Sequence, residues 1–218
     1  PPGKGDITNM IRSYIHRCQK DGVKIVMNCE VTPELIKEEK PDSVIIATGS
    51  KTLILPIEGI DNPAIIHGSD LLDGKRAAGK KVLVVGGGMV GCETAAFLGE
   101  QEHDVTVIEF RDTVGADVIH EHRVYLMKDF EDYGIKEITG AKVCKFYEDG
   151  VEYETADGVR HESRGYDSVI LSMGFRNYNP LEEKIKDLVP ETHVIGDAIR
   201  ARRALDATKE AYEVASRI

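Results

Sequence analysis

Hydrophobic residues along the chain occur in two kinds of pattern, which take turns along the sequence. Short apolar runs indicate strands, and stretches in which apolar residues recur every three or four positions indicate helices. We expect helices at residues 7–19, 32–40 and 115–133, after the glycines at 86–91, and at the C-terminus. We expect strands at residues 22–28, 42–50, 80–85, 104–109, 166–174 and 192–195. Strands that alternate with helices predict an α/β fold with parallel sheets.

Two Asp-Gly pairs interrupt the β-rich segment at residues 141–163, namely Asp149-Gly150 and Asp157-Gly158. An Asp-Gly pair between two strand-like runs is a strong hairpin signal. We therefore predict a three-stranded antiparallel meander. Residues 51–75 contain Pro and Gly but little periodicity, and we expect them to form a connecting stretch.

One apolar segment occurs a second time in the chain in similar form. The sequence DSVIIATG at residues 42–49 is repeated as DSVILSMG at residues 167–174. Two similar strands so far apart in the chain suggest two nucleotide-binding domains of related design.

Composition limits the classes of partner. The chain has 218 residues, a formal net charge of -10 and no long uncharged apolar stretch. An acidic surface repels phosphate backbones, so nucleic acid and membranes are not expected partners. Its four cysteines have no closely spaced pair, so we expect reduced structural thiols in a cytoplasmic protein and no metal site. The chain begins without Met or an apolar leader, and we interpret it as a fragment.

The segment VVGGGMVG carries the pattern GxGxxG at Gly86, Gly88 and Gly91. The first glycine permits a tight turn, the second lets a diphosphate approach the backbone, and the third lets the helix pack closely on the strand. The N-terminus of the following helix offers N–H groups and the positive end of its dipole to phosphates. Because the motif lies between a strand and a helix, we predict dinucleotide binding here, with Met89 and Val90 among the contacts.

The next strand ends in Glu109, eighteen residues after Gly91. A carboxylate at this place accepts hydrogen bonds from the adenosine ribose, which favours NAD over NADP. Arg111 could instead receive the 2′-phosphate of NADP, so the choice stays open. Phe110 lies between these two residues and is included in the predicted site.

Glu93 follows the last glycine, and we assign it to the first turn of the helix. There it could simply complement the helix dipole, or it could position a nicotinamide. The neighbouring Cys92 has no partner thiol close in sequence, so a packing role is expected for it.

Five segments, taken in order, resemble a known family. They are similar to the C-terminal part of the 2,4-dienoyl-CoA reductase and NADH oxidase group, flavoenzymes related to old yellow enzyme and trimethylamine dehydrogenase. The segments are ATGS (47–50), LPIEGID (55–61), VVGGGMVGCETA (84–95), ILSMGFRNYN (170–179) and VIGDAIRARRALDATKEAYEVA (194–215).

The resemblance implies a Rossmann-like NAD(P)-binding domain with a parallel sheet and a meander, inserted into a partial FAD-binding domain of related fold. Residues 77–184 would form the NAD(P) domain, and residues 1–76 and 185–218 would be two segments of the FAD domain. In this family an FMN-containing TIM barrel and a 4Fe–4S segment precede these domains. Both would lie in a missing N-terminal part.

The resemblance also implies site residues beyond the glycine motif. Thr48 and Gly49 resemble a turn beside the flavin nucleotide, and Gly196-Asp197 resembles a motif whose Asp binds the ribityl chain of FAD. Gly174 would lie near the nicotinamide nucleotide.

The chain departs from the family in several respects. The barrel, the cluster cysteines and the first strand and GxGxxG motif of the FAD domain are absent, as are the prolines usual after ATG. We therefore expect an incomplete FAD site and, in the fragment alone, weak activity or none.

Two functional hypotheses follow. The chain could be the electron-entry module of an NAD(P)H-dependent flavin oxidoreductase, which passes hydride from NAD(P)H, NADH being favoured, to FAD. Alternatively, it could hold ADP or another nucleotide passively, as in relatives that resemble trimethylamine dehydrogenase. A methyltransferase shares the glycine turn but does not account for the other segments.

Overall fold

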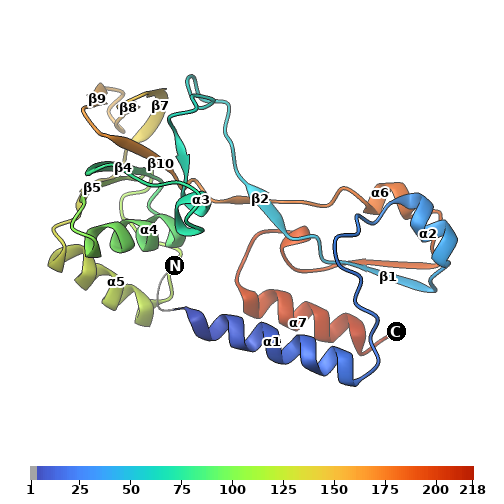
Figure 1. Ribbon diagram of the computed structural model, residues 1–218. Coiled ribbons are helices and arrows are strands. Elements are labelled where there is room, and N and C mark those ends of the chain that lie inside the picture. Colours follow the sequence, from blue (N-terminus) through green and yellow to red (C-terminus); the bar gives the residue numbers. More distant parts are fainter. Residues whose placement is uncertain (1–3) are drawn as a thin grey trace. The chain divides into compact units, whose positions relative to one another are not determined.

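The computed structural model describes residues 4–218, and their contacts divide the chain into two compact units (Figure 1). Unit 1 contains Lys4, Gly5 and Ile54–Gly174, and unit 2 contains Asp6–Leu53 and Phe175–Ile218. The predicted segments divide instead after residues 76 and 184, and their assignment to NAD(P) and FAD stays a prediction.

Unit 1 is built on a parallel five-stranded sheet with the strand order β3-β10-β4-β5-β6. Because consecutive parallel strands need a crossover, helices follow the strands, and α4 connects β4 to β5. The predicted parallel α/β architecture is confirmed. Its elements are β3 (Ile66–His67), α3 (Gly68–Leu72), β4 (Lys81–Val85), α4 (Met89–Glu100), β5 (Asp104–Ile108), α5 (His120–Asp132), β6 (Lys136–Ile138) and β10 (Ser168–Leu171).

Both faces of this sheet are buried, which explains why its strands are continuous apolar runs. Alternate residues of each strand point to opposite faces. Val84 and Val107 belong to a core that includes residues of α4 and α5. Leu83 and Leu171 belong to a second core on the other face, which includes Phe146 of the meander. Figure 1 shows α4 and α5 on one side of β4 and β5.

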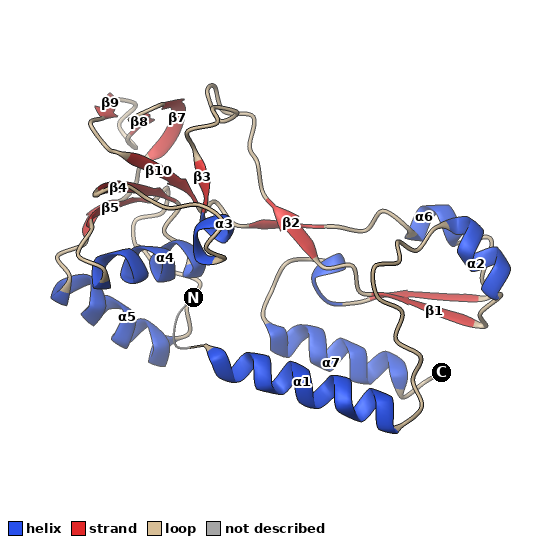
Figure 2. Ribbon diagram, viewed as in Figure 1, coloured by secondary structure: helices blue, strands red, loops and turns tan. Residues whose placement is uncertain are grey.

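The meander consists of β7 (Lys142–Tyr147), β8 (Gly150–Glu154) and β9 (Arg160–Ser163), all antiparallel (Figure 2). Both predicted Asp-Gly hairpins are confirmed. Gly150 is required at the first turn because a Cβ there would lie 2.0 Å from the Ser163 carbonyl oxygen.

Unit 2 contains two short two-stranded sheets, β1 with β12 in parallel and β2 with β11 antiparallel. A small core brings six buried residues together: Ile36, Ile46, Leu181, Ile185, Val189 and Ala198. Its elements are α1 (Gly5–Lys20), α2 (Pro33–Glu39), β1 (Ser43–Ile46), β2 (Ser50–Thr52), β11 (Phe175–Asn177), α6 (Glu182–Ile185), β12 (Glu191–Val194), a 3-10 turn (Gly196–Ala198) and α7 (Ala204–Ala215).

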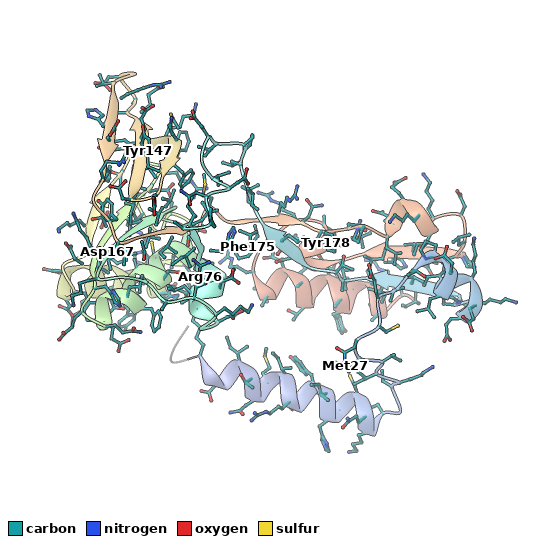
Figure 3. All side chains as sticks on the ribbon, turned by 45° about the horizontal axis from the view of Figure 1, so that its top comes forward. Met27, Arg76, Tyr147, Asp167, Phe175 and Tyr178 are labelled. Carbon is teal, nitrogen blue, oxygen red and sulfur yellow. The ribbon has the colours of Figure 1, made fainter. Side chains whose placement is uncertain are left out.

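Two local interactions in unit 2 show how its short elements are fixed. The Thr32 side chain accepts a hydrogen bond from the Leu35 N–H at 3.3 Å, so Thr32 and Pro33 begin α2 as predicted. The Lys51 ammonium lies 3.6 Å from the centroid of the Tyr178 ring, a cation–π contact (Tyr178 is labelled in Figure 3).

The strand predicted at residues 22–28 is wrong. These residues form no strand, and Val23, Val26 and Met27 are exposed. β-branched residues fit a pleated surface, but a strand also needs a neighbour with which to pair.

Three other predictions need correction. Residues 51–75 are not wholly irregular, because they contain the end of β2 and all of β3 and α3. The helix predicted at 115–133 begins only at His120, since Gly115 has a φ of +64°, which is not helical, and lies in a turn at 114–117. The strand predicted at 42–50 is shorter, because β1 covers only Ser43–Ile46 and Ser50 begins β2; Ile45 of β1 is 39% exposed.

The two-faced burial of the sheet predicts a contrast between two valines of unit 1. Val107 of β5 is 0% exposed and Val124 of α5 is 56% exposed. We expect Val107→Ala to lower the free energy of unfolding by about 2 kcal/mol, because it removes buried methyl groups and leaves a cavity. Val124→Ala should change it by less than about 0.5 kcal/mol. Urea unfolding followed by circular dichroism measures both, and equal losses would contradict the assigned core.

Candidate functional site

The glycine loop, defined as Gly86–Gly91, lies at the carboxyl edge of the parallel sheet. The Gly86 N–H donates to the Ile108 carbonyl at 2.9 Å, and the Ser172 N–H donates to the Val85 carbonyl at 2.8 Å. The ends of β4, β5 and β10 therefore meet here. The chain passes from β4 to β5 on one side, while β10 pairs with β4 on the other. Ligands of open α/β sheets bind at such a switch point.

The first and last glycines are required by the fold. Gly86 has a φ of +105°, and a Cβ there would lie 2.4 Å from the Ser172 carbonyl oxygen. A Cβ on Gly91 would lie only 1.8 Å from the Gly86 carbonyl oxygen. Helix α4 therefore packs directly on the loop from which it starts, as the spacing predicted.

Gly88 differs from its neighbours, because its own backbone does not require a glycine. Its φ of -73° suits any residue, and a Cβ would meet only the Asp117 carboxylate, at 3.2 Å. The missing side chain leaves space in front of the N-terminus of α4. This is the observation that fits the site to a diphosphate, since a bound phosphate needs close access to backbone N–H groups.

Gly87 occupies an unspecified position of the motif, and sequence reasoning missed its role. A Cβ there would lie 2.9 Å from both the Glu109 Cβ and a methyl group of Val114. The middle one of the three consecutive glycines therefore lets β5 and the residues after it approach the loop. The run of three consecutive glycines was the sequence signal that could have indicated this close approach.

Glu109 is held at the end of β5 by two backbone donors. Its Oε2 accepts from the Gly87 N–H at 2.6 Å, and its Oε1 accepts from the Arg111 N–H at 2.9 Å. The predicted acid is therefore beside the glycine loop, with a fixed orientation. Phe110 is 69% exposed, and Arg111 is also exposed. Their contacts with a coenzyme stay predictions.

The β5–α5 loop, residues 111–119, lies against the glycine loop. The Gly115 N–H donates to the Gly87 carbonyl at 2.7 Å. The Asp117 Oδ1 accepts from the Met89 N–H at 2.9 Å, at the first residue of α4. Sequence reasoning missed Asp117, because nothing in the local sequence of 111–119 shows which helix this acid reaches.

Glu93 lies in the second turn of α4, because the helix begins at Met89. The sequence prediction of a first-turn acid is therefore wrong, and dipole complementation at the N-terminus does not explain this residue. Its carboxylate forms an ion pair with Lys4, and its side chain is only 11% exposed. Lys4 was not anticipated, because it is far from Glu93 in sequence.

Cys92 is fully buried under the glycine loop, and its thiol donates to the Gly87 carbonyl at 3.2 Å. Burial raises the pKa of the Cys92 thiol to about 12. The packing role expected from the sequence agrees with this environment, since a thiol with such a pKa is not a nucleophile near neutral pH.

Gly174 follows β10 and is the last residue of unit 1. Its φ is +98°, and a Cβ there would meet nothing within 4 Å. The glycine is thus required by the turn and not by crowding. A nucleotide contact at Gly174 stays a prediction.

The remaining predicted residues lie together in unit 2. The Thr48 hydroxyl donates to the Tyr178 carbonyl, and Gly49 has a φ of +76° with open space beside it. The Asp197 carboxylate accepts from the Ser50 hydroxyl at 3.2 Å and from the Arg202 N–H at 3.0 Å.

Gly196 is tied to α7 by a residue that sequence reasoning missed. Its N–H donates to the Glu210 Oε2 at 2.7 Å, while the Arg202 guanidinium binds the Glu210 Oε1. The Arg202 side chain and the Gly196 N–H together hold the pKa of the Glu210 carboxyl below its usual value. Glu210 is therefore ionised at neutral pH and fixes the turn that presents Asp197.

Among residues 4–218 no cluster of three or more His, Cys, Asp or Glu side chains is arranged to hold a metal ion. Within the same part of the chain, no helix has the length and apolar character needed to span a membrane.

Comparison with known proteins gives consistent matches. The family model described as pyridine nucleotide-disulphide oxidoreductase matches residues 5–196. Cinnamate reductase of Clostridium sporogenes is 30% identical, with 100% of this chain and 33% of the relative aligned. NADH oxidase of Thermoanaerobacter brockii is 31% identical, with 100% of this chain and 34% of the relative aligned.

A solved structure agrees with these matches. A 2-naphthoyl-CoA reductase in complex with 2-naphthoyl-CoA has a TM-score of 0.87 at 31% identity, covering 98% of this chain and 32% of that one. The chain thus spans about a third of the length of the relatives it matches. The Rossmann-like dinucleotide-binding fold agrees with all three.

The burial of Cys92 predicts selective alkylation. At pH 8 a thiol whose pKa is about 12 is a thiolate in roughly one molecule in ten thousand. We expect iodoacetamide to label the exposed Cys29 in the folded protein and to label Cys92 only after unfolding in urea. Peptide mapping by mass spectrometry measures both sites. Equal labelling of Cys92 and Cys29 in the folded protein would contradict the packing role.

Proposed function

Because the chain belongs to the pyridine nucleotide-disulphide oxidoreductase family, we propose that it is the nucleotide-binding electron-entry module of an NAD(P)H-dependent flavin oxidoreductase. Within that family we infer the NADH oxidase and 2,4-dienoyl-CoA reductase type. The observation that carries the proposal is the glycine loop at the carboxyl edge of the sheet, where Gly88 places no side chain in front of α4 and only the Asp117 carboxylate lies within contact of that position.

The glycine loop would hold the diphosphate of NAD(P)H. The first N–H groups of any helix have no acceptor four residues earlier, so those of Val90 and Gly91 have no partner within α4, and that of Met89 donates to Asp117. These groups belong to the N-terminus of α4, next to Gly88, and the helix dipole adds a positive potential there. Backbone groups thus supply attraction for an anionic ligand in a chain with a net charge of -10.

Glu109 would select the coenzyme. Its two backbone hydrogen bonds fix the carboxylate at the end of β5, where it can accept from ribose hydroxyl groups. A 2′-phosphate at the same place would be repelled, so NADH is favoured. The exposed Arg111 supports the alternative, because its guanidinium could bind that phosphate.

Unit 2 would contribute to FAD binding through Thr48, Gly49, Gly196 and Asp197. The left-handed Gly49 beside open space supports this, as does the fixed carboxylate of Asp197. The fit is partial, because the only GxGxxG motif in the chain is the one at 86–91. We infer that the rest of the FAD site, with FMN and a 4Fe–4S centre, belongs to a longer protein, as in the resembling family.

When bound, NAD(P)H supplies a hydride for a flavin, and this is cofactor chemistry. The residues of this chain would bind the coenzyme and set its orientation. Glu93, paired with the half-exposed Lys4, is a candidate for positioning the nicotinamide end. The names of the relatives suggest reduction of an unsaturated acyl compound or of oxygen as the overall reaction, and the fragment alone would have little activity.

Gly88→Val tests the proposal. We expect the Gly88→Val variant to fold normally, since the φ of Gly88 is ordinary and a Cβ there meets only the exposed Asp117 carboxylate. Its side chain would fill the space of the diphosphate, so NADH affinity should fall about a hundredfold or more. Calorimetric titration of the purified chain with NADH, NADPH, ADP and FAD measures this.

The matched control is Ala156→Val in the exposed turn between β8 and β9, which should leave every affinity unchanged. Thermal melting verifies that both variants fold. Binding of NADH to Gly88→Val as tightly as to the unaltered chain would refute the assigned site. If ADP bound the unaltered chain as tightly as NADH did, the nicotinamide would contribute no affinity. The hypothesis of a passive nucleotide-binding module would then replace that of an electron-entry module.

Coenzyme selection gives a second prediction. We expect Glu109→Gln to reduce the preference for NADH over NADPH by about tenfold, because the amide keeps the side-chain shape but loses the charge that repels a 2′-phosphate. Arg111→Gln should weaken the binding of NADPH and leave the affinity for NADH nearly unchanged. Competitive titration with both coenzymes measures the ratio, and an unaltered ratio in Glu109→Gln would exclude Glu109 as the selecting residue.

A further inference from the structure

The carboxylate of Asp117 occupies the N-terminus of α4, where a phosphate is expected. Its Oδ1 accepts from the Met89 N–H at 2.9 Å, and its Oδ2 would lie 3.2 Å from a Cβ on Gly88. We propose that Asp117 is an internal anion that competes with the coenzyme diphosphate for these N–H groups, so that the coenzyme binds only as this carboxylate moves away. This inference rests on the proposed function and names the residue that limits its affinity.

The main chain around Asp117 is firmly anchored. Val114 and Val118, on either side of it, are 0% and 8% exposed and belong to the core shared with α4 and α5. The Gly115 N–H donates a hydrogen bond to the Gly87 carbonyl, and the Arg123 guanidinium donates one to the Val114 carbonyl at 3.1 Å. The carboxylate is thus brought to α4 by the fold of the whole loop.

The side chain itself can leave. Asp117 is exposed, and the single hydrogen bond described for its carboxylate is the one from Met89. Rotation about its side-chain bonds would move the charge into water without moving Val114 or Val118. The Met89 N–H can then exchange one anionic acceptor for another, so its hydrogen bond is kept in both states.

The two anions exclude each other. Asp117 lies in the space that the absence of a Gly88 side chain leaves open, which is the space assigned to the diphosphate. Like charges a few ångströms apart repel each other. The same contact therefore satisfies the helix N-terminus in the free protein and weakens coenzyme binding.

Asp117→Asn tests the inference, because it keeps the side-chain shape and a hydrogen-bond acceptor but removes the charge. We expect NADH and ADP to bind about tenfold more tightly to this variant, and adenosine, which has no phosphate, to bind unchanged. The gain should shrink in 1 M salt, where the Debye length is about 3 Å. Calorimetry measures the affinities, and thermal melting without ligand verifies the fold.

Asp112→Asn is the matched control. Asp112 lies in the same loop, but its carboxylate faces Gly140, so the variant removes an equal charge away from α4. Unchanged or weaker binding of NADH to Asp117→Asn would overturn the inference alone. An equal gain in Asp112→Asn would overturn it as well, by assigning the effect to net charge. If neither NADH nor ADP bound any of these proteins, the proposed function would fail together with the inference.

Discussion

The contact between Gly91 and the carbonyl of Gly86 governs the geometry of the glycine-loop unit. With room for only a hydrogen atom between them, α4 starts directly on the turn that leaves β4. The helix then lies along β4 and β5 with its apolar side in the core, and its N-terminus lies at the carboxyl edge of the sheet. A larger residue at Gly91 would push the helix away from the sheet. Core packing and the presentation of backbone donors thus depend on the same missing side chain.

Backbone groups carry most of the polar chemistry around that edge. Glu109 and Asp117 each accept a hydrogen bond from a backbone N–H, Glu109 from Gly87 and Asp117 from Met89. An acidic chain can therefore offer a site for an acidic ligand, because the favourable potential is local and comes from aligned peptide dipoles. The two carboxylates differ in freedom, since Glu109 is held by two donors and Asp117 by one.

The parts of the fold that follow from neighbouring residues could be predicted from the sequence. The glycine spacing, the acid at the end of β5 and the Asp-Gly hairpins are local signals, and the structure has each in the expected element. The role of Asp117 could not be predicted, because it depends on how residues 111–119 pack on another loop. The strand predicted at 22–28 failed for the related reason that apolar β-branched residues do not reveal whether a partner strand is present. Glu93 was misplaced by one turn because the exact start of a helix is poorly determined by sequence.

The uneven distribution of buried side chains has a consequence for motion. In unit 1 the strands of a five-stranded sheet are covered on both faces, whereas the core of unit 2 consists of six residues between short elements. Local opening needs less free energy where fewer apolar contacts must be broken. Amide protons of β1 and β12 should therefore exchange with solvent long before those of β4, β5 and β10. The rigid part of the chain is then the one that carries the glycine loop, and slow fluctuations are concentrated in the part that would support the flavin.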